Sequence, residues 1–230
     1  MEKVSILIPV YNEIDTIGTI LEKVENASFC GLEKEIILID DFSTDGTKDI
    51  LKSLENKYKV IYHKKNQGKG AALRTGFAAV TGDITVIQDA DLEYDPDDYE
   101  GVIKLILDGK ADVAYGSRFL DLAGSTTVVK ANFLANKMLT LFTNILFGAK
   151  LTDMETCYKA FNTAFIKDIK IKSDRFDFEP EITAKVLKKK ARLAEAPITY
   201  NGRTFEEGKK ITWVDGIHAV LALVKYRFID

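Results

Sequence analysis

Acidic side chains crowd residues 86–96, VIQDADLEYDP, directly after a run of apolar residues. Asp89 and Asp91 stand two positions apart, and side chains at i and i+2 of an extended chain point the same way. Both carboxylates can therefore reach one hard cation that prefers oxygen ligands, such as Mg²⁺ or Mn²⁺. Glu93 can join them directly or through water. The spacing predicts a divalent metal site with Asp89, Asp91 and Glu93 as its candidate ligands.

A helix N-terminus is the alternative explanation for these acids, since carboxylates there complement the helix dipole. This explanation suits Asp95, Asp97 and Asp98, which flank Pro96. It suits Asp89 and Asp91 less well, because they stand at the end of the apolar run. We therefore expect the later acids to serve a helix and the earlier ones to serve a metal.

The elements that must position these acids alternate between strand and helix through residue 116. Such alternation predicts an α/β fold with a mostly parallel sheet flanked by helices. Strands are expected at 4–10, 35–41, 59–65, 82–91 and 111–119, with helices at 13–27, 43–57, 68–80 and 95–109. Ligands of such sheets bind beyond the carboxyl ends of the strands. The polar residues that follow the strands, at 11–13, 40–41, 66–70 and 89–91, should converge on one rim.

The second half of the chain, residues 117–230, breaks this rhythm. Helices are expected at 131–147, 179–190 and 213–228, with a strand at 192–200 and a loop at 201–210. We interpret this half as an elaboration on the first, within a single domain of residues 1–230.

Composition limits the classes of function. Of the 230 residues, 46% are hydrophobic and 29% are charged, which is ordinary for a soluble globular protein. A net charge of −3 gives no global basic field, so we expect no nucleic-acid partner. The two cysteines, Cys30 and Cys157, make neither a disulfide framework nor a zinc site. We expect a reduced, cytoplasmic setting and no segment with the ~18 apolar residues that span a bilayer.

Asp40 and Lys69 are further candidates on the rim. Asp40 and Asp41 end the second strand, where one of the two carboxylates can accept hydrogen bonds from a ribose or base. Lys69 lies in NQGKG, residues 66–70, whose backbone N–H groups can meet an anion at the start of a helix. That motif is a weak signal by itself, because helices that open with glycine are common. The chain has no GxxxxGK[ST] motif and no GxGxxG motif after the first strand. Kinases, ATPases and simple dinucleotide-binding proteins therefore lose support.

Basic residues in the second half could clamp phosphate oxygens. Arg118 ends the fifth expected strand, and Arg203, Lys209 and Lys210 lie in the loop GRTFEEGKK. The alternative is a solvated surface loop, and the residues by themselves favour that alternative.

Read together, these motifs resemble family 2 glycosyltransferases with the GT-A fold. The matching segments, in the family's order, are IPVYNE (8–13), LIDDFSTDGT (38–47), NQGKGAALRTG (66–76) and VIQDADLEYDP (86–96). Segments of the second half resemble the branch of dolichyl-phosphate mannose synthase and bacterial polyprenyl-phosphate glycosyltransferases: GSRF (116–119), LTDMETCYKAF (151–161), FDFEPEITAK (176–185) and YNGRTFEEGKK (200–210). The resemblance covers nearly the whole chain.

The resemblance implies a nucleotide-sugar-binding half, residues 1–116, and an acceptor-side half, residues 117–230. It implies a set of donor-binding residues: Pro9, Tyr11, Glu13, Asp40, Lys69, Asp89 and Ala90. Asp89 and Asp91, with Glu93, would hold Mg²⁺ or Mn²⁺ on the donor diphosphate. Many mannose synthases have glutamine at the position of Glu93.

Four residues would be catalytic by the same resemblance: Asp91, Arg118, Arg203 and Lys209. The three basic ones would contact donor or acceptor phosphates. Lys130 or Lys137 could supply the basic residue that the synthases use after the fifth strand.

The reaction implied is transfer of a hexose from GDP-mannose or a UDP-sugar to a polyprenyl or dolichyl phosphate, with inversion. A lipid phosphate oxygen is already anionic, whereas a sugar hydroxyl of a glycan or cell-envelope polysaccharide needs a base. Asp153 or Glu155 would be that base. A non-catalytic nucleotide-sugar-binding subunit is an alternative of another class. A nucleotidyltransferase is disfavoured, because residues 9–16 lack its glycine-rich basic signature.

Two amphipathic segments bear on location. The helices expected at 131–147 and 213–228, the latter with Trp213, Leu221, Val224 and Phe228, could lie on the cytoplasmic face of a membrane. Alternatively their apolar stripes pack against the sheet, which we favour for most of their residues. Peripheral attachment, or a separate membrane partner, is the hypothesis that follows.

Overall fold

A computed structural model of the chain describes residues 1–120, 125–127, 130–202 and 213–229, with side chains described at 1–120, 133–202 and 215–229. Its centre is a seven-stranded sheet with the strand order β3-β2-β1-β4-β7-β5-β8. The strands are β1 (Lys3–Val10), β2 (Glu33–Asp40), β3 (Lys59–Tyr62), β4 (Ile84–Ile87), β5 (Val113–Ser117), β7 (Lys159–Asn162) and β8 (Leu193–Pro197). β6 (Ser125–Thr127) and β9 (Tyr200–Asn201) form a separate two-stranded sheet.

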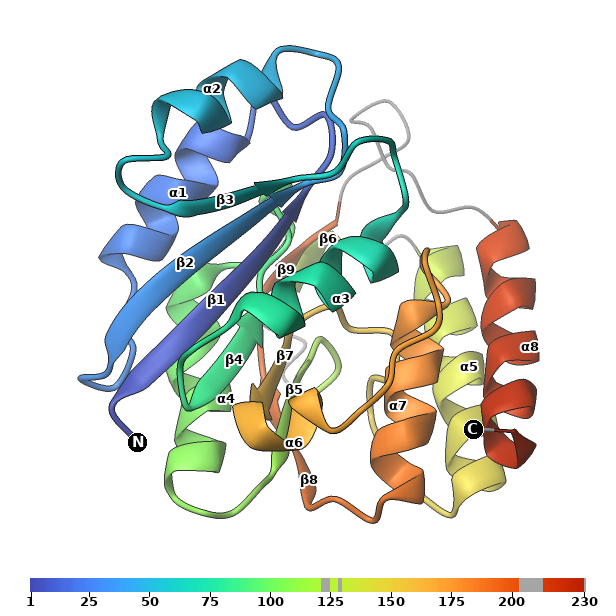
Figure 1. Cartoon of the computed structure of the whole chain (residues 1–230). Helices are drawn as coiled ribbons and strands as arrows, with labels where there is room; N and C mark the ends of the chain where they lie inside the picture. The colour runs from blue at the N-terminus through green and yellow to red at the C-terminus, as the bar shows by residue number, and fades with distance from the viewer. Residues whose placement is uncertain (121–124, 128–129, 203–212, 230) are drawn as a thin grey trace.

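Helices cover both faces of the large sheet (Figure 1). They are α1 (Ile17–Asn26), α2 (Thr47–Ser53), α3 (Lys69–Ala79), α4 (Tyr99–Leu107), α5 (Lys130–Phe147), α6 (Thr163–Lys167), α7 (Phe178–Lys188) and α8 (Trp213–Phe228). A short 3₁₀ turn, Pro96–Asp98, precedes α4.

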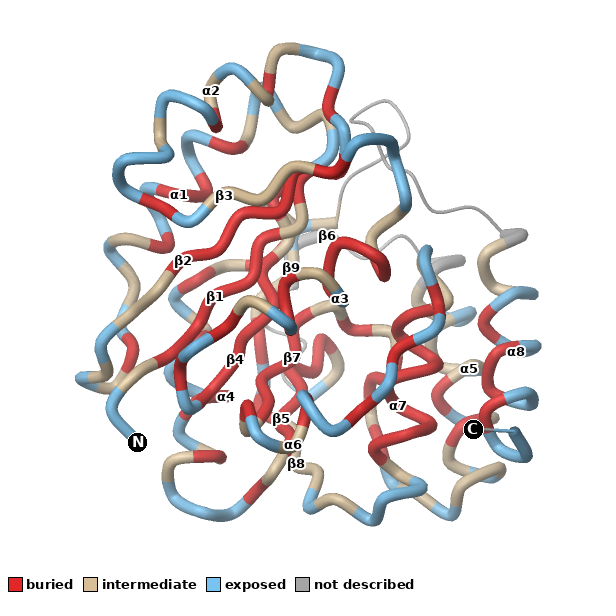
Figure 2. Tube along the Cα trace, in the orientation of Figure 1, coloured by how far each residue is buried: buried red, intermediate tan, exposed pale blue. Residues whose placement is uncertain are grey.

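Alternation along β1 divides the core into two layers, because successive side chains of a strand point to opposite faces. Ile6 and Ile8 pack in the cluster that contains the apolar residues of α1 and α4. Leu7 packs in the cluster that contains those of α3, α6 and α7. The strands in the middle of the sheet are mostly buried, as the red core of the tube in Figure 2 shows, whereas the edge strands β3 and β8 are mostly half-buried.

A third layer lies outside α7. The apolar residues Phe142 and Leu146 of α5 and Leu223 of α8 form their own cluster with Leu187 of α7. In Figure 1, α5, α7 and α8 stand side by side at one end of the sheet. The expectation that the stripes of α5 and α8 pack on the sheet is therefore wrong for α8, which packs on α7 and α5.

The mostly parallel sheet expected from the sequence is confirmed, with one strand that the sequence did not indicate. β7 enters the sheet between β4 and β5 and runs antiparallel to both. Its sequence, KAFN, begins with a lysine that is buried in the structure. Lysine is not typical of a buried strand, so the pattern did not indicate one. The seven-stranded sheet contains β7 and β8 from the second half of the chain beside the strands of the first half. None of the helices within the described ranges has both the length and the apolar character needed to cross a bilayer.

Gly70 fixes the start of α3, the helix that carries Lys69. A Cβ added at Gly70 would lie 2.4 Å from the backbone oxygen of Ser173, closer than real atoms approach. The backbone N–H of Ala71 donates to the backbone oxygen of Asp174 at 3.1 Å. Only glycine allows this close approach of two backbones.

Gly70→Ala is therefore expected to lower the free energy of unfolding by about 2 kcal/mol or more, because backbone must move. Gly18→Ala in α1 is the matched control, since nothing lies within 4 Å of its added Cβ. It should raise that free energy by about 0.5–1 kcal/mol. Urea denaturation of both variants measures the difference, and equal effects would refute the packing argument.

Candidate active site

Strained backbone marks one rim of the sheet. The loops after the neighbouring strands β1, β2 and β4 each contain a non-glycine residue with positive φ: Asn12 (54°), Phe42 (69°) and Leu92 (64°). Such conformations are uncommon and cluster at functional sites. This rim is the one at which the sequence placed its candidate residues.

Asp40, at the end of β2, presents an unused acceptor. The residue is 0% exposed, and its Oδ1 accepts the backbone N–H of Ser43 at 3.2 Å. Within the described residues its Oδ2 has no hydrogen-bond partner. A buried carboxylate oxygen without a partner is costly, so a ligand hydroxyl or N–H is the natural group to complete it.

Asp41 shapes the loop that carries Lys69. Its carboxylate accepts the backbone N–H groups of Gln67 at 2.9 Å and Gly68 at 2.7 Å. It also contacts Nδ1 of His63 at 2.7 Å, and Nε2 of that ring contacts Oγ1 of Thr75 at 2.9 Å. Asp41, which the sequence offered beside Asp40 as a ribose or base acceptor, thus positions the loop instead. It takes two of the backbone N–H groups of residues 66–70 that were expected to meet an anion.

A buried network of charges lies at the start of α3. Nζ of Lys69 is 2.6 Å from Oδ1 of Asp89 and 3.7 Å from Oε1 of Glu179. The other oxygen of Glu179 is 2.5 Å from Nζ of Lys159. Burial would lower the pKa of Lys69, but the charge of Asp89 outweighs it and holds the pKa well above its usual value. The structure therefore joins two residues predicted separately, Lys69 and Asp89.

Glu179 and Lys159 were missed by the sequence analysis. Both are buried, with Lys159 at 0% exposed, and Nζ of Lys159 stands 4.5 Å from the centre of the Tyr115 ring. The segments that hold them, 151–161 and 176–185, were noted only as part of a resemblance. Charged residues are almost never fully buried unless paired, and nothing in the sequence indicates the pairing.

The acidic loop after β4 is bound to the second half of the chain. Oδ1 of Asp91 accepts the backbone N–H of Glu93 at 3.2 Å. Oε2 of Glu93 accepts the Tyr200 hydroxyl at 2.9 Å, and the backbone oxygen of Glu93 accepts the N–H of Asn201 at 2.9 Å. The segment that leads to Arg203 is thereby held against the acidic loop.

The predicted metal ligands can be tested against this geometry. Across the described part of the chain, no group of three or more His, Cys, Asp or Glu side chains is arranged to hold a metal ion. A three-carboxylate site of Asp89, Asp91 and Glu93 is therefore not formed by the side chains alone. Mg²⁺ is usually held by one or two carboxylates together with substrate phosphates. Asp89 and Asp91 suit that arrangement, and metal binding by them stays a prediction.

Asp95 serves the helix start, as expected. Its Oδ1 accepts the backbone N–H of Asp97 at 3.2 Å, at the first turn before α4. Its Oδ2 also pairs with Nζ of Lys23 at 2.7 Å. These contacts confirm the helix-start role for Asp95. Asp98 does not share it: its carboxylate accepts the backbone N–H and the hydroxyl of Thr199, both at 2.7 Å, and makes no side-chain cap.

Arg118 and Asp153 form a buried bidentate pair. Nε and Nη2 of Arg118 donate to the two carboxylate oxygens of Asp153 at 2.7 and 2.8 Å. The guanidinium also lies 5.1 Å from the centre of the Tyr200 ring. Asp153 is 0% exposed, so its oxygens are committed to Arg118 and it is a poor candidate for a base.

Glu155, unlike Asp153, has a carboxylate oxygen that pairs with no other described group. Its Oε1 is buried and has no hydrogen-bond partner within the described residues. Burial, followed by the charge of Glu179, raises the pKa of Glu155 to about 7 despite the opposing charges of Lys159 and Arg118. The group can therefore take up or release a proton near neutral pH.

Some of the remaining predicted residues lie within the described part of the chain and the others lie outside it. Pro9 is half-buried near the end of β1, and exposed Tyr11 and half-buried Glu13 follow that strand. Ala90 is buried next to Asp89 in the chain. Nζ of Lys137 lies 4.2 Å from the centre of the Phe119 ring, next to Arg118 in the chain. The predicted residues Arg203, Lys209 and Lys210 and the side chain of Lys130 lie outside the described residues.

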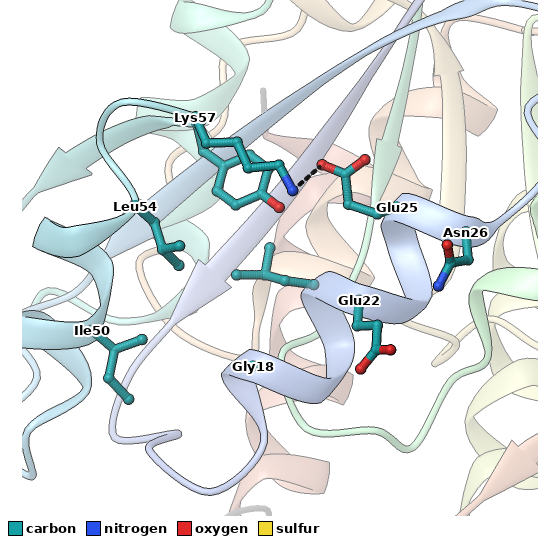
Figure 3. A pocket seen from close by; sticks show the side chains of 9 residues that line it. Gly18, Glu22, Glu25, Asn26, Ile50, Leu54 and Lys57 are labelled. Carbon is teal, nitrogen blue, oxygen red and sulfur yellow. Dashed lines mark ion pairs between the residues drawn. The ribbon is translucent and has the colours of Figure 1, made fainter.

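A cleft of about 480 Å³ opens elsewhere, between α1 and α2 (Figure 3). Apolar residues such as Leu21 and Leu54 line it, together with the ion pair of Lys57 and Glu25, whose Nζ and Oε1 are 3.2 Å apart. None of the residues predicted from the sequence lines this cleft, which is distinct from the rim.

Comparison with known proteins identifies the family of the chain. Residues 5–170 match the model of the family described as "Glycosyl transferase family 2". The chain is 38% identical over 120 residues to a dolichol-phosphate mannosyltransferase of Pyrococcus furiosus, a match that covers 51% of this chain but only 34% of that protein. It is 28% identical to a UDP-N-acetylglucosamine–dolichyl-phosphate N-acetylglucosaminyltransferase of Methanococcus voltae, over 84% of this chain and 83% of that protein.

Solved structures share the fold. Glucosyl-3-phosphoglycerate synthase from Mycobacterium tuberculosis, in complex with Mn²⁺, UDP and phosphoglyceric acid, superposes with a TM-score of 0.75 at 17% identity. The superposition covers 100% of this chain and 80% of that one. The same synthase was also solved with Mg²⁺ and UDP.

The raised pKa of Glu155 predicts a dependence of stability on pH. A carboxyl group whose pKa rises on folding stabilises the fold while protonated, and that contribution is lost as the pH rises from about 4.5 to about 7. Glu155→Gln stays neutral and should remove a loss of about 1–3 kcal/mol in the free energy of unfolding across this range. Denaturation at several pH values measures it, with exposed Glu100→Gln as the control. A pH profile unchanged by Glu155→Gln would contradict the assignment.

Proposed function

Because the chain belongs to glycosyl transferase family 2, we propose that this glycosyltransferase moves a hexose from a nucleotide diphosphate sugar to a polyprenyl phosphate, with inversion at the anomeric carbon. The family resemblance and the GT-A fold expected from the sequence are confirmed. The reaction partners and the roles of single residues are the proposal.

The unpartnered, buried Oδ2 of Asp40 is the observation that carries the proposal. A carboxylate at the end of a strand of a parallel sheet is suited to accept hydrogen bonds from a ribose or a base. Pro9, Tyr11 and Glu13 belong to the neighbouring strand end and would complete the nucleoside site. This arrangement supports a nucleotide as the donor's leaving group.

Lys69, Asp89 and Asp91 would hold the diphosphate end of the donor. The Lys69 ammonium is kept charged and in place by Asp89 and Glu179, and Ala90 lies buried between Asp89 and Asp91. Mg²⁺ or Mn²⁺ held by Asp89 and Asp91 would supply neutralisation of the charge on the leaving diphosphate. Metal complexes of the similar synthase support divalent metal use in this fold.

The acceptor is inferred to be a lipid phosphate. Two similar proteins carry names that specify dolichol phosphate. An ionised phosphate oxygen is nucleophilic without a base, which agrees with the commitment of Asp153 to Arg118. Arg118 with Arg203 and Lys209 would contact the phosphates, and Lys137 lies nearby on the Phe119 ring.

A second candidate is a glycosyltransferase that acts on a sugar hydroxyl. A pKa of about 7 at Glu155 is close to the ideal for a general base at neutral pH. The unpartnered Oε1 of Glu155 could accept the hydroxyl proton.

Asp40→Asn is expected to weaken donor binding by about 10- to 100-fold, because it removes a charged acceptor from a buried site. Titration calorimetry with GDP-mannose, UDP-glucose and UDP-N-acetylglucosamine measures the change in affinity. Asp49→Asn, at an exposed position of α2, is the control and should bind as the wild type does. Equal affinity of both variants would exclude Asp40 from the nucleoside site.

The product assay tests the reaction itself. The protein is incubated with each radiolabelled nucleotide sugar, a short polyprenyl phosphate and Mg²⁺ or Mn²⁺. One donor is expected to give a glycolipid, chelator should abolish it, and Asp91→Asn should lower the rate by at least about 100-fold through loss of charge stabilisation. Asp97→Asn, at an exposed position, is the matched control.

The two candidate acceptors are separated by Glu155→Gln. If the acceptor is a lipid phosphate, this variant should keep most of its activity. Product on a sugar hydroxyl only, lost in Glu155→Gln, would establish the second candidate. No product on either acceptor and no binding of any donor would refute both.

A further inference from the structure

His63 is a buried residue that contacts both acids at the end of β2. It is 8% exposed and directly follows β3, and its backbone N–H donates to the backbone oxygen of Asp40 at 2.9 Å. Its ring lies against the carboxylate of Asp41, with Nδ1 2.7 Å from Oδ1. The backbone of His63 is therefore bonded to one acid of the rim and its side chain to the next.

The ring of His63 also reaches the helix that carries Lys69. Nε2 lies 2.9 Å from Oγ1 of Thr75, a residue of α3, and α3 begins at Lys69. A hydroxyl can donate or accept, whereas a carboxylate that already accepts two backbone N–H groups is suited only to accept another donor. Nδ1 therefore carries the proton that is shared with Asp41, and one imidazole connects Asp41 with α3.

The loop between β3 and α3 depends on Asp41 for its conformation. Residues 64–67 are exposed, and the backbone N–H groups of Gln67 and Gly68 donate inward to Oδ1 and Oδ2 of Asp41. Gly68 has a φ of 97°, and Lys69 is the next residue. The direction in which Lys69 leaves the loop is therefore set by the position of the Asp41 carboxylate.

The neighbouring carboxylates of Asp40 and Asp41 face different partners. Oδ2 of Asp40 has no hydrogen-bond partner within the described residues, which leaves it for a nucleoside. Both oxygens of Asp41 accept from the loop instead. A substitution of the His63 side chain would keep its backbone bond to Asp40 and remove its contact with Asp41. The nucleoside end and the diphosphate end of the donor site are therefore separable at His63.

We propose that His63 is a positioning residue for recognition of the donor diphosphate, acting through Asp41 on the loop of residues 66–70 and thereby on Lys69. Its side chain sets the affinity for the diphosphate and leaves the affinity for the nucleoside unchanged. The inference deepens the proposed function and rests on it in one respect, that Lys69 meets the diphosphate of the donor.

Asparagine and glutamine substitutions separate the two contacts of the ring. The side-chain N–H of asparagine can replace Nδ1, and that of glutamine can replace Nε2. In titration calorimetry with GDP or UDP and Mg²⁺, His63→Asn should bind within about threefold of the wild type, whereas His63→Gln should lose at least about tenfold. Guanosine or uridine, measured by displacement, should bind all three proteins alike. His218→Gln, at an exposed position of α8, is the control and should bind as the wild type does.

Amide hydrogen exchange, followed by NMR, reports the position of the loop without a ligand. The backbone N–H groups of Gln67 and Gly68 should exchange at least about fivefold faster in His63→Gln than in the wild type or in His63→Asn. In the wild type, addition of GDP or UDP should shift the Nδ1 resonance of His63, and the nucleoside by itself should not. This last measurement needs no variant, so it tests the proposal even if a substituted protein fails to fold.

The outcomes separate this proposal from the proposed function. Equal losses in His63→Asn and His63→Gln, or an equal loss for nucleoside and diphosphate, would reduce His63 to a packing role and overturn the proposal. Wild-type binding of GDP or UDP that neither variant changes, or that leaves the Nδ1 resonance in place, overturns it as well and leaves the proposed function standing. Absence of any nucleotide binding by the wild type refutes the proposed function, and the role in recognition with it.

Discussion

The pairing of buried charges at the start of α3 is the constraint on which the rest of the site depends. Lys69, Asp89, Glu179 and Lys159 are held in one network, and each comes from a different element or loop. Removing one member would leave the charge of its partner buried and uncompensated, which is strongly unfavourable. The network therefore requires that α3, the end of β4, β7 and α7 all take their places together.

The antiparallel strand β7 is what makes this network possible. Because β7 lies between β4 and β5, Lys159 enters from the second half of the chain beside the end of β4. Glu179, in the first turn of α7, reaches both lysines. The two halves are thus joined at the point where donor and acceptor would meet, and Glu93 with Tyr200 adds a second link.

α7 connects the site with the outer layer. All of its residues from Phe178 to Val186 are buried, because the sheet covers one side and α5 and α8 cover the other. Its N-terminal turn holds Glu179, and the same helix contributes Ala184 to the cluster with Ala222 and Tyr226 of α8. α7 therefore connects the outer layer of α5 and α8 with the charged network at the rim.

Sequence by itself determined the strand–helix alternation of the first half, the rim and the family. Continuous apolar strands and amphipathic helices are local signals, and short motifs such as NQGKG and DAD can be recognised from adjacent residues alone. Convergence of Lys69 and Asp89 on one rim followed from the general geometry of parallel sheets.

Only the tertiary structure decided which charges are buried together and which apolar faces stay exposed. Nothing in the sequence indicated that Lys159 and Glu179 are buried, since their pairing joins residues that are 20 positions apart in the chain. The commitment of Asp153 to Arg118, 35 residues away, separated two carboxylates that the sequence treated as equivalent. The amphipathic pattern of α5 and α8 is the same whether a stripe meets a sheet or solvent. Contacts between distant segments decide which charges pair and which apolar faces are covered. The periodicity of a sequence indicates only the local secondary structure and which residues share a face.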